Sequence, residues 1–202
     1  LGETILGAQT QFKTAFSNKG TFIRSVNQAQ TWLASGTVDL PYKPSNWLDR
    51  RIINIEPEAI KKMVLLRSDS SSFIIARDNP DEKFSALTSR GLIELQEESE
   101  KTFTSSVSKL TFDDVFPRNE QEASSIEFEI VIFTFSGLEI KLKLWNSDKI
   151  WLVNLISKVD QVAVDGNSKF RSDNLNKRFG GWNFQIAKWK AERFLAMLHA
   201  AP

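Results

Sequence analysis

Tryptophan and basic side chains gather near the end of this chain of 202 residues, and their combination can bind anions or sugars. Arg178, Trp182 and Lys188 follow one another closely, and Trp189 and Lys190 come next. A tryptophan ring offers an apolar face and an N–H donor, while arginine and lysine attract carboxylates and phosphates. Arg178, Trp182 and Lys188 are therefore candidate ligand-binding residues. The alternative is that the six tryptophans, which are spread over the whole chain, fill the core of a sheet-and-helix domain.

The charge distribution draws attention to the same region. The net charge of +1 predicts neither a nucleic-acid partner nor an acidic one. Residues 78–129 hold thirteen acidic and five basic side chains, whereas residues 166–202 hold seven basic and two acidic ones. Either the two segments form solvated surfaces of opposite sign that attract each other, or the basic segment faces an anionic partner.

No set of catalytic residues stands out in the sequence. His199 is the only histidine, and it falls in the last turn of a predicted helix, where a cation suits the helix dipole. Asp113 and Asp114 are adjacent, so in a strand they point to opposite faces and cannot share a proton or a metal. We therefore assign no catalytic residue and expect a protein that is not an enzyme.

Residues for a cofactor or a metal are also missing from the sequence. The absence of cysteine excludes disulfides, zinc–thiolate sites and iron–sulfur clusters, and a single histidine excludes a two-histidine metal site. The glycines match no phosphate-binding spacing. Residues 165–167 resemble the start of a calcium loop, but Lys169 stands at the third ligand position. We therefore predict no cofactor and no metal.

The strongest structural pattern lies in the second half of the chain. From Leu138 to Leu144 apolar and charged residues alternate, which predicts a strand with one apolar and one solvated face. The preceding run, 128–135, is rich in β-branched and aromatic residues, and Ser136-Gly137 predicts a tight turn between the two. A third strand at 150–153 follows the turn-forming residues 146–148. These patterns predict a three-stranded antiparallel meander.

Shorter patterns predict the remaining elements. Strands are expected at 3–7, 21–26, 30–34, 52–55, 63–67, 73–77 and 182–186, and helices at 97–110, 172–179 and 188–199. Residues 78–90 are expected to be irregular. In the helix at 97–110, Phe103, Val107 and Leu110 form one apolar stripe.

These elements predict an α+β fold of antiparallel sheets, formed by meanders and hairpins, each packed by an amphipathic helix. We expect two sequential modules, 1–117 and 118–202, with the first truncated at its N-terminus. The boundary is placed there because residues 118–125 hold no apolar side chain larger than Ala123. No run approaches the roughly 20 apolar residues of a membrane-spanning helix. Leu1 stands first in place of methionine, so the absence of a signal peptide says nothing about compartment.

Three stretches together resemble a known family. They are Gly20–Arg24 followed by Gln30–Leu33; Trp47–Arg50 leading to Ile52 and Ile55; and Leu175-Asn176 leading to Gly181–Ile186 and Lys190-Ala191. They are similar to the bacterial family called domain of unknown function 4340. The resemblance implies an extracytoplasmic body behind an N-terminal membrane anchor, in a family often encoded beside gliding-motility-type ABC transporter genes. It implies no catalytic residue, because the family has no established activity.

The resemblance and the missing catalytic set lead to one functional expectation. The chain is expected to be a periplasmic, membrane-associated binding or scaffold module, accessory to an ABC-type transport assembly on the periplasmic side of the inner membrane. Its partners would be proteins of a transport or envelope assembly and not nucleic acid, with membrane contact only through a missing N-terminal anchor. The alternative is a glycan-acting enzyme or glycan-binding domain that uses carboxylates and tryptophan platforms.

Overall fold

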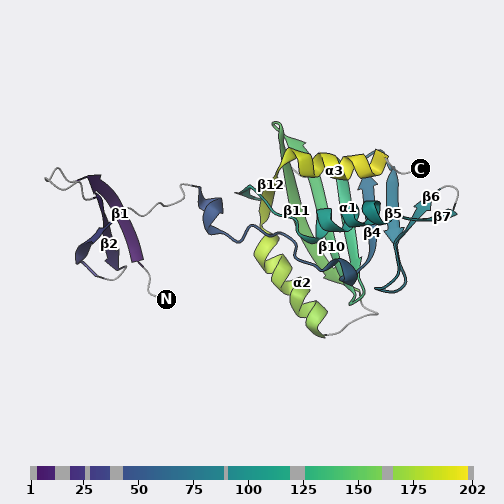
Figure 1. The fold of residues 1–202 in the computed structure, drawn as a ribbon, viewed down its shortest axis with the longest axis horizontal. Coiled ribbons are helices and arrows are strands. Elements are labelled where there is room, and N and C mark those ends of the chain that lie inside the picture. The colour runs from purple at the N-terminus through teal and green to yellow at the C-terminus, as the bar shows by residue number, and fades with distance from the viewer. Residues whose placement is uncertain are drawn as a thin grey trace. The chain divides into compact units, whose positions relative to one another are not determined.

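Two antiparallel sheets organise the residues that the computed structural model describes, which are 4–11, 19–25, 28–36, 43–88, 91–118, 126–160 and 166–199. They belong to two units, Leu1–Trp47 and Leu48–Pro202. The first unit contains β1 (Thr4–Gln11), β2 (Lys19–Ser25), β3 (Thr31–Ser35) and the 3₁₀ helix η1 (Pro44–Trp47). The strands lie in the order β1-β2-β3, which confirms the predicted hairpin formed by β2 and β3 (Figure 1).

The second unit holds a nine-stranded sheet in the order β7-β6-β5-β4-β9-β10-β11-β12-β8. Its strands are β4 (Ile60–Arg67), β5 (Ser72–Ala76), β6 (Ser85–Thr88), β7 (Gly91–Glu94), β8 (Asp114–Pro117), β9 (Phe128–Thr134), β10 (Leu138–Ser147), β11 (Ile150–Val159) and β12 (Trp182–Ile186). Its helices are η2 (Pro57–Ala59), α1 (Glu97–Ser108), α2 (Gly166–Phe179) and α3 (Lys188–His199). The predicted α+β class with antiparallel sheets is therefore confirmed.

The predicted meander is present as β9, β10 and β11. Leu142 of β10 faces Ile130 on one side and Leu155 on the other. The second turn differs from the prediction, because residues 146 and 147 continue β10 and the turn consists of Asp148 and Lys149, with φ of 49° and 69°. A two-residue turn with positive φ matches the twist of paired strands, so this hairpin is longer than the turn-forming residues suggest.

Two short segments also differ from their predictions. The segment from Ile52 to Ile55 is not a strand: the N–H groups of both residues donate to carbonyls at the end of α1, on Leu110 (2.8 Å) and Ser108 (3.0 Å). Residues 85–88, expected to be irregular, form β6 and pair with β7. A four-residue strand shows too little periodicity to be recognised, and its pairing depends on a neighbour.

The expected division into modules 1–117 and 118–202 falls inside the second unit. β4 pairs with β9, where Met63 faces Ile132, and β8 pairs with β12, where Val115 faces Phe184. Strands from both sides of the expected boundary therefore belong to one sheet. In each pair, one strand supplies hydrogen-bond partners for backbone groups that the other strand would otherwise leave unpaired.

All three α-helices cover one face of this sheet, which we call the helix-covered face (Figure 1). Every second residue of β10 is buried there, from Leu138 to Leu144. The helices contribute Phe103 and Val107 of α1, Phe179 of α2, and Phe194 and Met197 of α3. The intervening residues point to the opposite face, where Glu129 lies 3.2 Å from Lys141 and 3.8 Å from Lys143.

Candidate functional site

Side-chain hydrogen bonds of one asparagine and two serines join helix α2 to β11. The side chain of Asn176 accepts a hydrogen bond from the Ser157 N–H (2.8 Å) and donates one to the Ser157 carbonyl (2.8 Å). The Ser157 hydroxyl donates to the Ser172 carbonyl (2.9 Å). One amide side chain therefore satisfies both backbone groups of a strand residue. These bonds fix the rotation of α2 about its own axis relative to the sheet. The bonds determine which α2 side chains face the segment 48–55.

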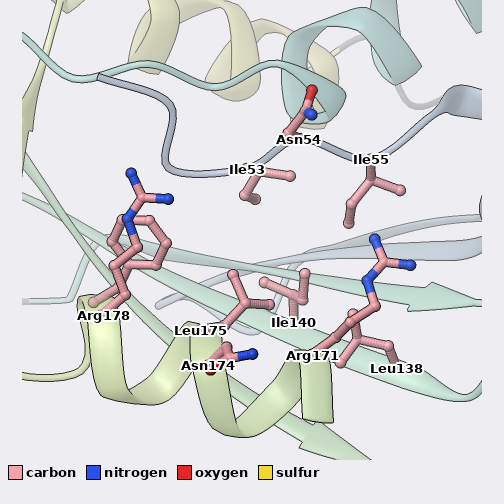
Figure 2. Close-up of a pocket in the computed structure, with 10 residues that line it drawn as sticks. Ile53, Asn54, Ile55, Leu138, Ile140, Arg171, Asn174, Leu175 and Arg178 are labelled. Atoms are coloured by element: carbon pink, nitrogen blue, oxygen red, sulfur yellow. The ribbon is translucent and has the colours of Figure 1, made fainter. Parts of the chain in front are cut away.

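A cavity of about 220 Å³ lies between α2 and the segment Ile53–Ile55, and we call it the α2 cavity (Figure 2). Its lining consists of Ile53, Asn54, Ile55, Leu138, Ile140, Arg171, Asn174, Leu175, Arg178 and Phe179. Apart from the half-buried Leu175, the apolar lining residues are buried, whereas the two arginines and two asparagines are exposed. The cavity therefore has an apolar floor and a polar rim that carries two positive charges.

The two guanidinium groups come from one side of α2. Arg171 and Arg178 are two helical turns apart, which places them on the same side of the helix. Figure 2 shows them at either end of the cavity, with Leu175 and Asn174 between them. Arg171 has no hydrogen bond or ion pair to any residue that the structure describes. Its donors are thus available to an anion that enters the cavity.

A second cavity, of about 280 Å³, shares Arg178 and Phe179 with the first, and we call it the Trp182 cavity. It is lined by Leu48, Asp49, Phe112, Val115, Arg178, Phe179, Trp182 and Phe184. Arg178 Nη2 lies 3.4 Å from Asp49 Oδ2, and the guanidinium carbon lies 4.9 Å from the centre of the Phe179 ring. Arg178 therefore stands between the two cavities with Asp49 as its partner.

Asp49 is the only acidic residue among the described residues that line the two cavities. Arg51 donates to it through Nε (2.9 Å), Nη2 (3.0 Å) and the backbone N–H (3.2 Å). These bonds from Arg51, with a smaller contribution from Arg178, hold the pKa of Asp49 well below its ordinary value. The carboxylate stays ionised near neutral pH and cannot serve as a general acid.

The structure places two of the three candidate residues together. Arg178 and Trp182 both line the Trp182 cavity. Lys188 lines neither of the two cavities, and its Nζ lies 3.2 Å from Glu192 one turn further along α3. Strand β12 separates α2 from α3 in the chain. Lys188 therefore does not reach the cavity lined by Arg178 and Trp182, although it is near them in sequence.

A family model matches residues 12–128 of this chain, which is more than half of its length. The family is DUF4340, described as a domain of unknown function. The chain belongs to it. The matched range includes Asp49 and Asn54, whereas α2 with Arg171 and Arg178 lies beyond its end. No curated protein and no solved structure matches the chain.

Sequence reasoning missed three rim residues of the α2 cavity in this DUF4340 chain: Asn54, Arg171 and Asn174. A spacing of two helical turns between Arg171 and Arg178, with Leu175 between them, was the available signal. No comparable signal marks Asn54, because the pattern of residues 52–55 predicts a strand and not a cavity rim.

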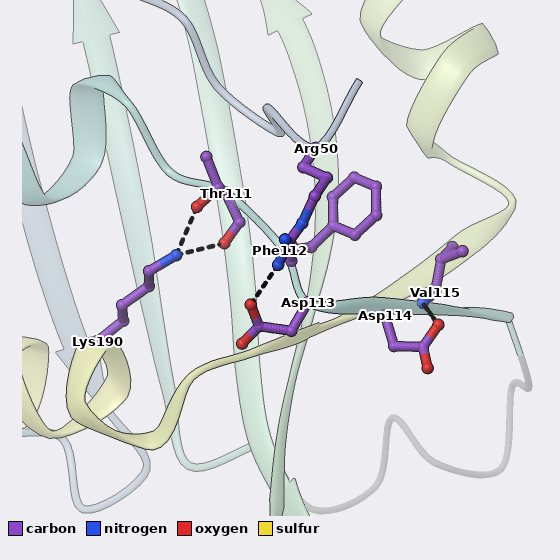
Figure 3. A network of polar contacts seen from close by, with 7 residues as sticks. All are labelled: Arg50, Thr111, Phe112, Asp113, Asp114, Val115 and Lys190. Atoms are coloured by element: carbon purple, nitrogen blue, oxygen red, sulfur yellow. Dashed lines mark hydrogen bonds and ion pairs between the residues drawn. The ribbon is translucent and has the colours of Figure 1, made fainter. Parts of the chain in front are cut away.

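The paired acids of this DUF4340 chain have separate partners (Figure 3). Asp113 Oδ1 accepts from Arg50 Nη2 (2.5 Å), and Asp114 Oδ1 accepts from the N–H of Val115 (3.0 Å). His199 is the last residue of α3, and its side chain lies outside the described part. Over the described ranges, no group of three or more histidine, cysteine, aspartate or glutamate side chains could hold a metal ion.

The six tryptophans of this DUF4340 chain divide between core and surface. Trp145 and Trp151 are buried, as the core interpretation predicts. Trp32, Trp47, Trp182 and Trp189 are 43% to 62% exposed, so the core interpretation does not apply to them.

None of the helices that the structure describes combines the length and the apolar character needed to cross a membrane.

Proposed function

We propose that this DUF4340 chain is a non-catalytic binding module whose α2 cavity receives a small amphipathic anion. The observation that carries the proposal is Arg171, whose guanidinium stands at the rim of an apolar cavity without an acceptor among the described residues. A ligand with a short apolar body and one carboxylate would satisfy both parts of the site.

The chemistry of the lining supports this ligand class. Burial of hydrocarbon against Ile53, Ile55 and Ile140 stabilises a complex by about 25 cal/mol for each Å² removed from water. A guanidinium group binds a carboxylate through two parallel hydrogen bonds, which adds direction to the charge attraction. A volume of about 220 Å³ is below the roughly 300 Å³ at which ligand pockets usually begin, so the ligand is small.

The family resemblance supports a proposal for the compartment and the partners of the module. We place it on the periplasmic side of the inner membrane, behind an N-terminal anchor, as an accessory of an ABC-type transport assembly with protein partners. This setting rests on the family resemblance and not on the cavity. The test is protease treatment of intact cells after the outer membrane is permeabilised: cleavage of the full-length protein is expected, and protection would contradict the setting.

A glycan-acting enzyme is the alternative, and the Trp182 cavity is the feature that favours it. Trp182 is partly exposed beside Asp49 and Arg178 in that cavity. Glycoside hydrolysis needs two carboxyl groups, roughly 5–10 Å apart, one of which is protonated. Asp49 is the single acid in the described lining, and its lowered pKa keeps it ionised. The cavity therefore favours binding of a ligand over its hydrolysis.

Titration calorimetry with octanoate tests the proposed ligand class. Arg171→Gln is expected to weaken octanoate binding about tenfold, because a charge-assisted bidentate contact is lost. The matched control is Lys177→Gln, which removes one exposed positive charge from the same helix outside both cavities and is expected to leave binding within about twofold. Equal losses in the two variants, or equal binding of neutral 1-octanol, would show that the rim does not recognise an anion.

A search for catalytic turnover tests the non-catalytic part of the proposal. Asp49→Asn removes the acid shared with Arg178 and Arg51. Hydrolysis of any glycan by the wild-type chain that disappears in this variant would refute the proposal and establish the alternative.

A further inference from the structure

A third, smaller cavity lies where α1 ends beside the beginning of α3, and we call it the α1–α3 cavity. Its volume is about 70 Å³, and its lining includes Ser105, Ser106, Lys109, Trp189, Lys190 and Arg193. Three of these six residues are basic, and the lining contributed by described residues contains no aspartate or glutamate. It shares no lining residue with the α2 cavity or the Trp182 cavity.

One of the three cations is held in place by Thr111. Lys190 Nζ donates to the carbonyl of Thr111 (2.8 Å) and to its hydroxyl (2.6 Å) (Figure 3). An ammonium group has three donors, so one remains. Burial lowers the pKa of Lys190; Asp113 opposes this shift, and Arg50 adds to it.

Two of the three cations lie close to the exposed ring of Trp189. Lys190 Nζ lies 5.6 Å and the guanidinium carbon of Arg193 lies 5.4 Å from the centre of the Trp189 ring. Arg193 also lines a wider surface hollow with Glu97 and Glu98, but in the described part of the chain it forms an ion pair with neither. Lys109 likewise has no ion pair to a described residue. Two positive charges thus lie close to one ring, and the described lining of this cavity includes no acidic side chain.

We propose that the α1–α3 cavity binds the phosphate group of a phosphate ester. Water occupies roughly 30 Å³ per molecule, so about 70 Å³ admits an oxyanion but not the organic body attached to it. The three cations donate to the phosphate oxygens, and the organic part lies outside against Trp189, which is 57% exposed. The phosphate belongs either to a soluble ester or to a lipid headgroup, since both present the same charged group.

Titration calorimetry of the full chain with glycerol 3-phosphate at low salt tests the proposal. Arg193→Gln is expected to weaken binding at least about fivefold. The control is Lys188→Gln, which removes the same charge from the same helix outside the cavity and is expected to change binding less than about twofold. No saturable binding by the wild-type chain would overturn the proposal, and so would an equal loss in both variants, which would show attraction by net charge alone.

A second variant and a vesicle assay complete the test. Lys109→Gln, at an exposed position after α1, must also weaken binding, so the proposal stays testable if Arg193→Gln fails to fold. Phosphatidylglycerol vesicles then distinguish the two sources. Sedimentation that excess glycerol 3-phosphate and Arg193→Gln both abolish supports a lipid headgroup, and binding of glycerol 3-phosphate without sedimentation supports a soluble ester. Sedimentation that neither change affects would contradict the proposed cavity.

Discussion

The two faces of the nine-stranded sheet differ in what their side chains do: one face is buried under helices, and the other carries solvated charges. On the helix-covered face Leu138, Ile140, Leu142 and Leu144 of β10 are buried under α1, α2 and α3. On the opposite face the residues between them bear charges, and Lys141 and Lys143 both lie near Glu129. Apolar burial makes the first face the main source of stability, since cross-strand ion pairs near a surface contribute little.

The comparison also locates the candidate sites. The three cavities are lined by the helices of the helix-covered face: the α2 cavity and the Trp182 cavity by α2, and the α1–α3 cavity by α1 and α3. Their rims hold cations from α2 and α3. The proposed binding sites therefore lie at the border of the stabilising face, where buried apolar residues meet solvated charges.

The largest expected effect is loss of packing on the helix-covered face. Leu142→Ala removes a fully buried side chain and is expected to lower the free energy of unfolding by about 2–5 kcal/mol. Lys143→Ala, one position away on the opposite face, is expected to lower it by about 0.5 kcal/mol or less. Urea denaturation of both variants measures the difference. Similar losses would mean that the two faces do not differ as described.

A buried cation at the end of β5 gives the next largest effect. Arg77 donates to the carbonyls of Pro57 (2.6 Å), Ile60 (2.9 Å) and Pro80 (2.8 Å). Arg77→Met leaves these acceptors without their partner and is expected to lower the free energy of unfolding by about 1–3 kcal/mol. Arg67→Met, which breaks only an exposed pair with Asp69, is the control, with an expected change of about 0–1 kcal/mol. A larger change in the control would contradict the assigned role.

The ion pairs of the opposite face are expected to contribute less. A double-mutant cycle with Glu129→Gln and Lys141→Gln is expected to give a coupling free energy of about 0.5 kcal/mol, because both side chains are partly solvated. Thermal unfolding of the four proteins measures it, and added salt should reduce it. A coupling of several kcal/mol that salt leaves unchanged would place this face among the stabilising parts of the molecule.

The smallest effect is expected at the solvated rim, and it depends on pH. The pKa of Asp49 is lowered in the folded chain, first by Arg51 and then by Arg178. Its stabilising contribution is therefore present above the unfolded pKa of about 3.9 and is lost as the pH falls toward the lower folded pKa. Asp49→Asn should be less stable than the wild type between about pH 5 and pH 7, and the difference should shrink below about pH 4. Denaturation across this range measures it, and a difference that widens in acid would contradict the assigned pKa direction.

The sequence by itself determined the features that depend on local periodicity. The alternation from Leu138 to Leu144 identified β10 and both of its faces, and the stripe of Phe103, Val107 and Leu110 identified α1 to within two residues. It also singled out Arg178 and Trp182, which line one cavity. These inferences succeed because a side chain's direction in a helix or strand follows from its position in the repeat.

Only the tertiary structure decided which elements meet. The pairing of β4 with β9, the four-residue strands β6 and β7, and the turn at Asp148 and Lys149 all depend on partners that no local pattern specifies. The same holds for the cavities, which are the space left between α2, α3 and the elements packed against them. Asn54 and Arg171 line one cavity because backbone hydrogen bonds join Ile53 to Leu110 and side-chain bonds join Asn176 to Ser157. Such long-range bonds leave no periodic trace in the sequence.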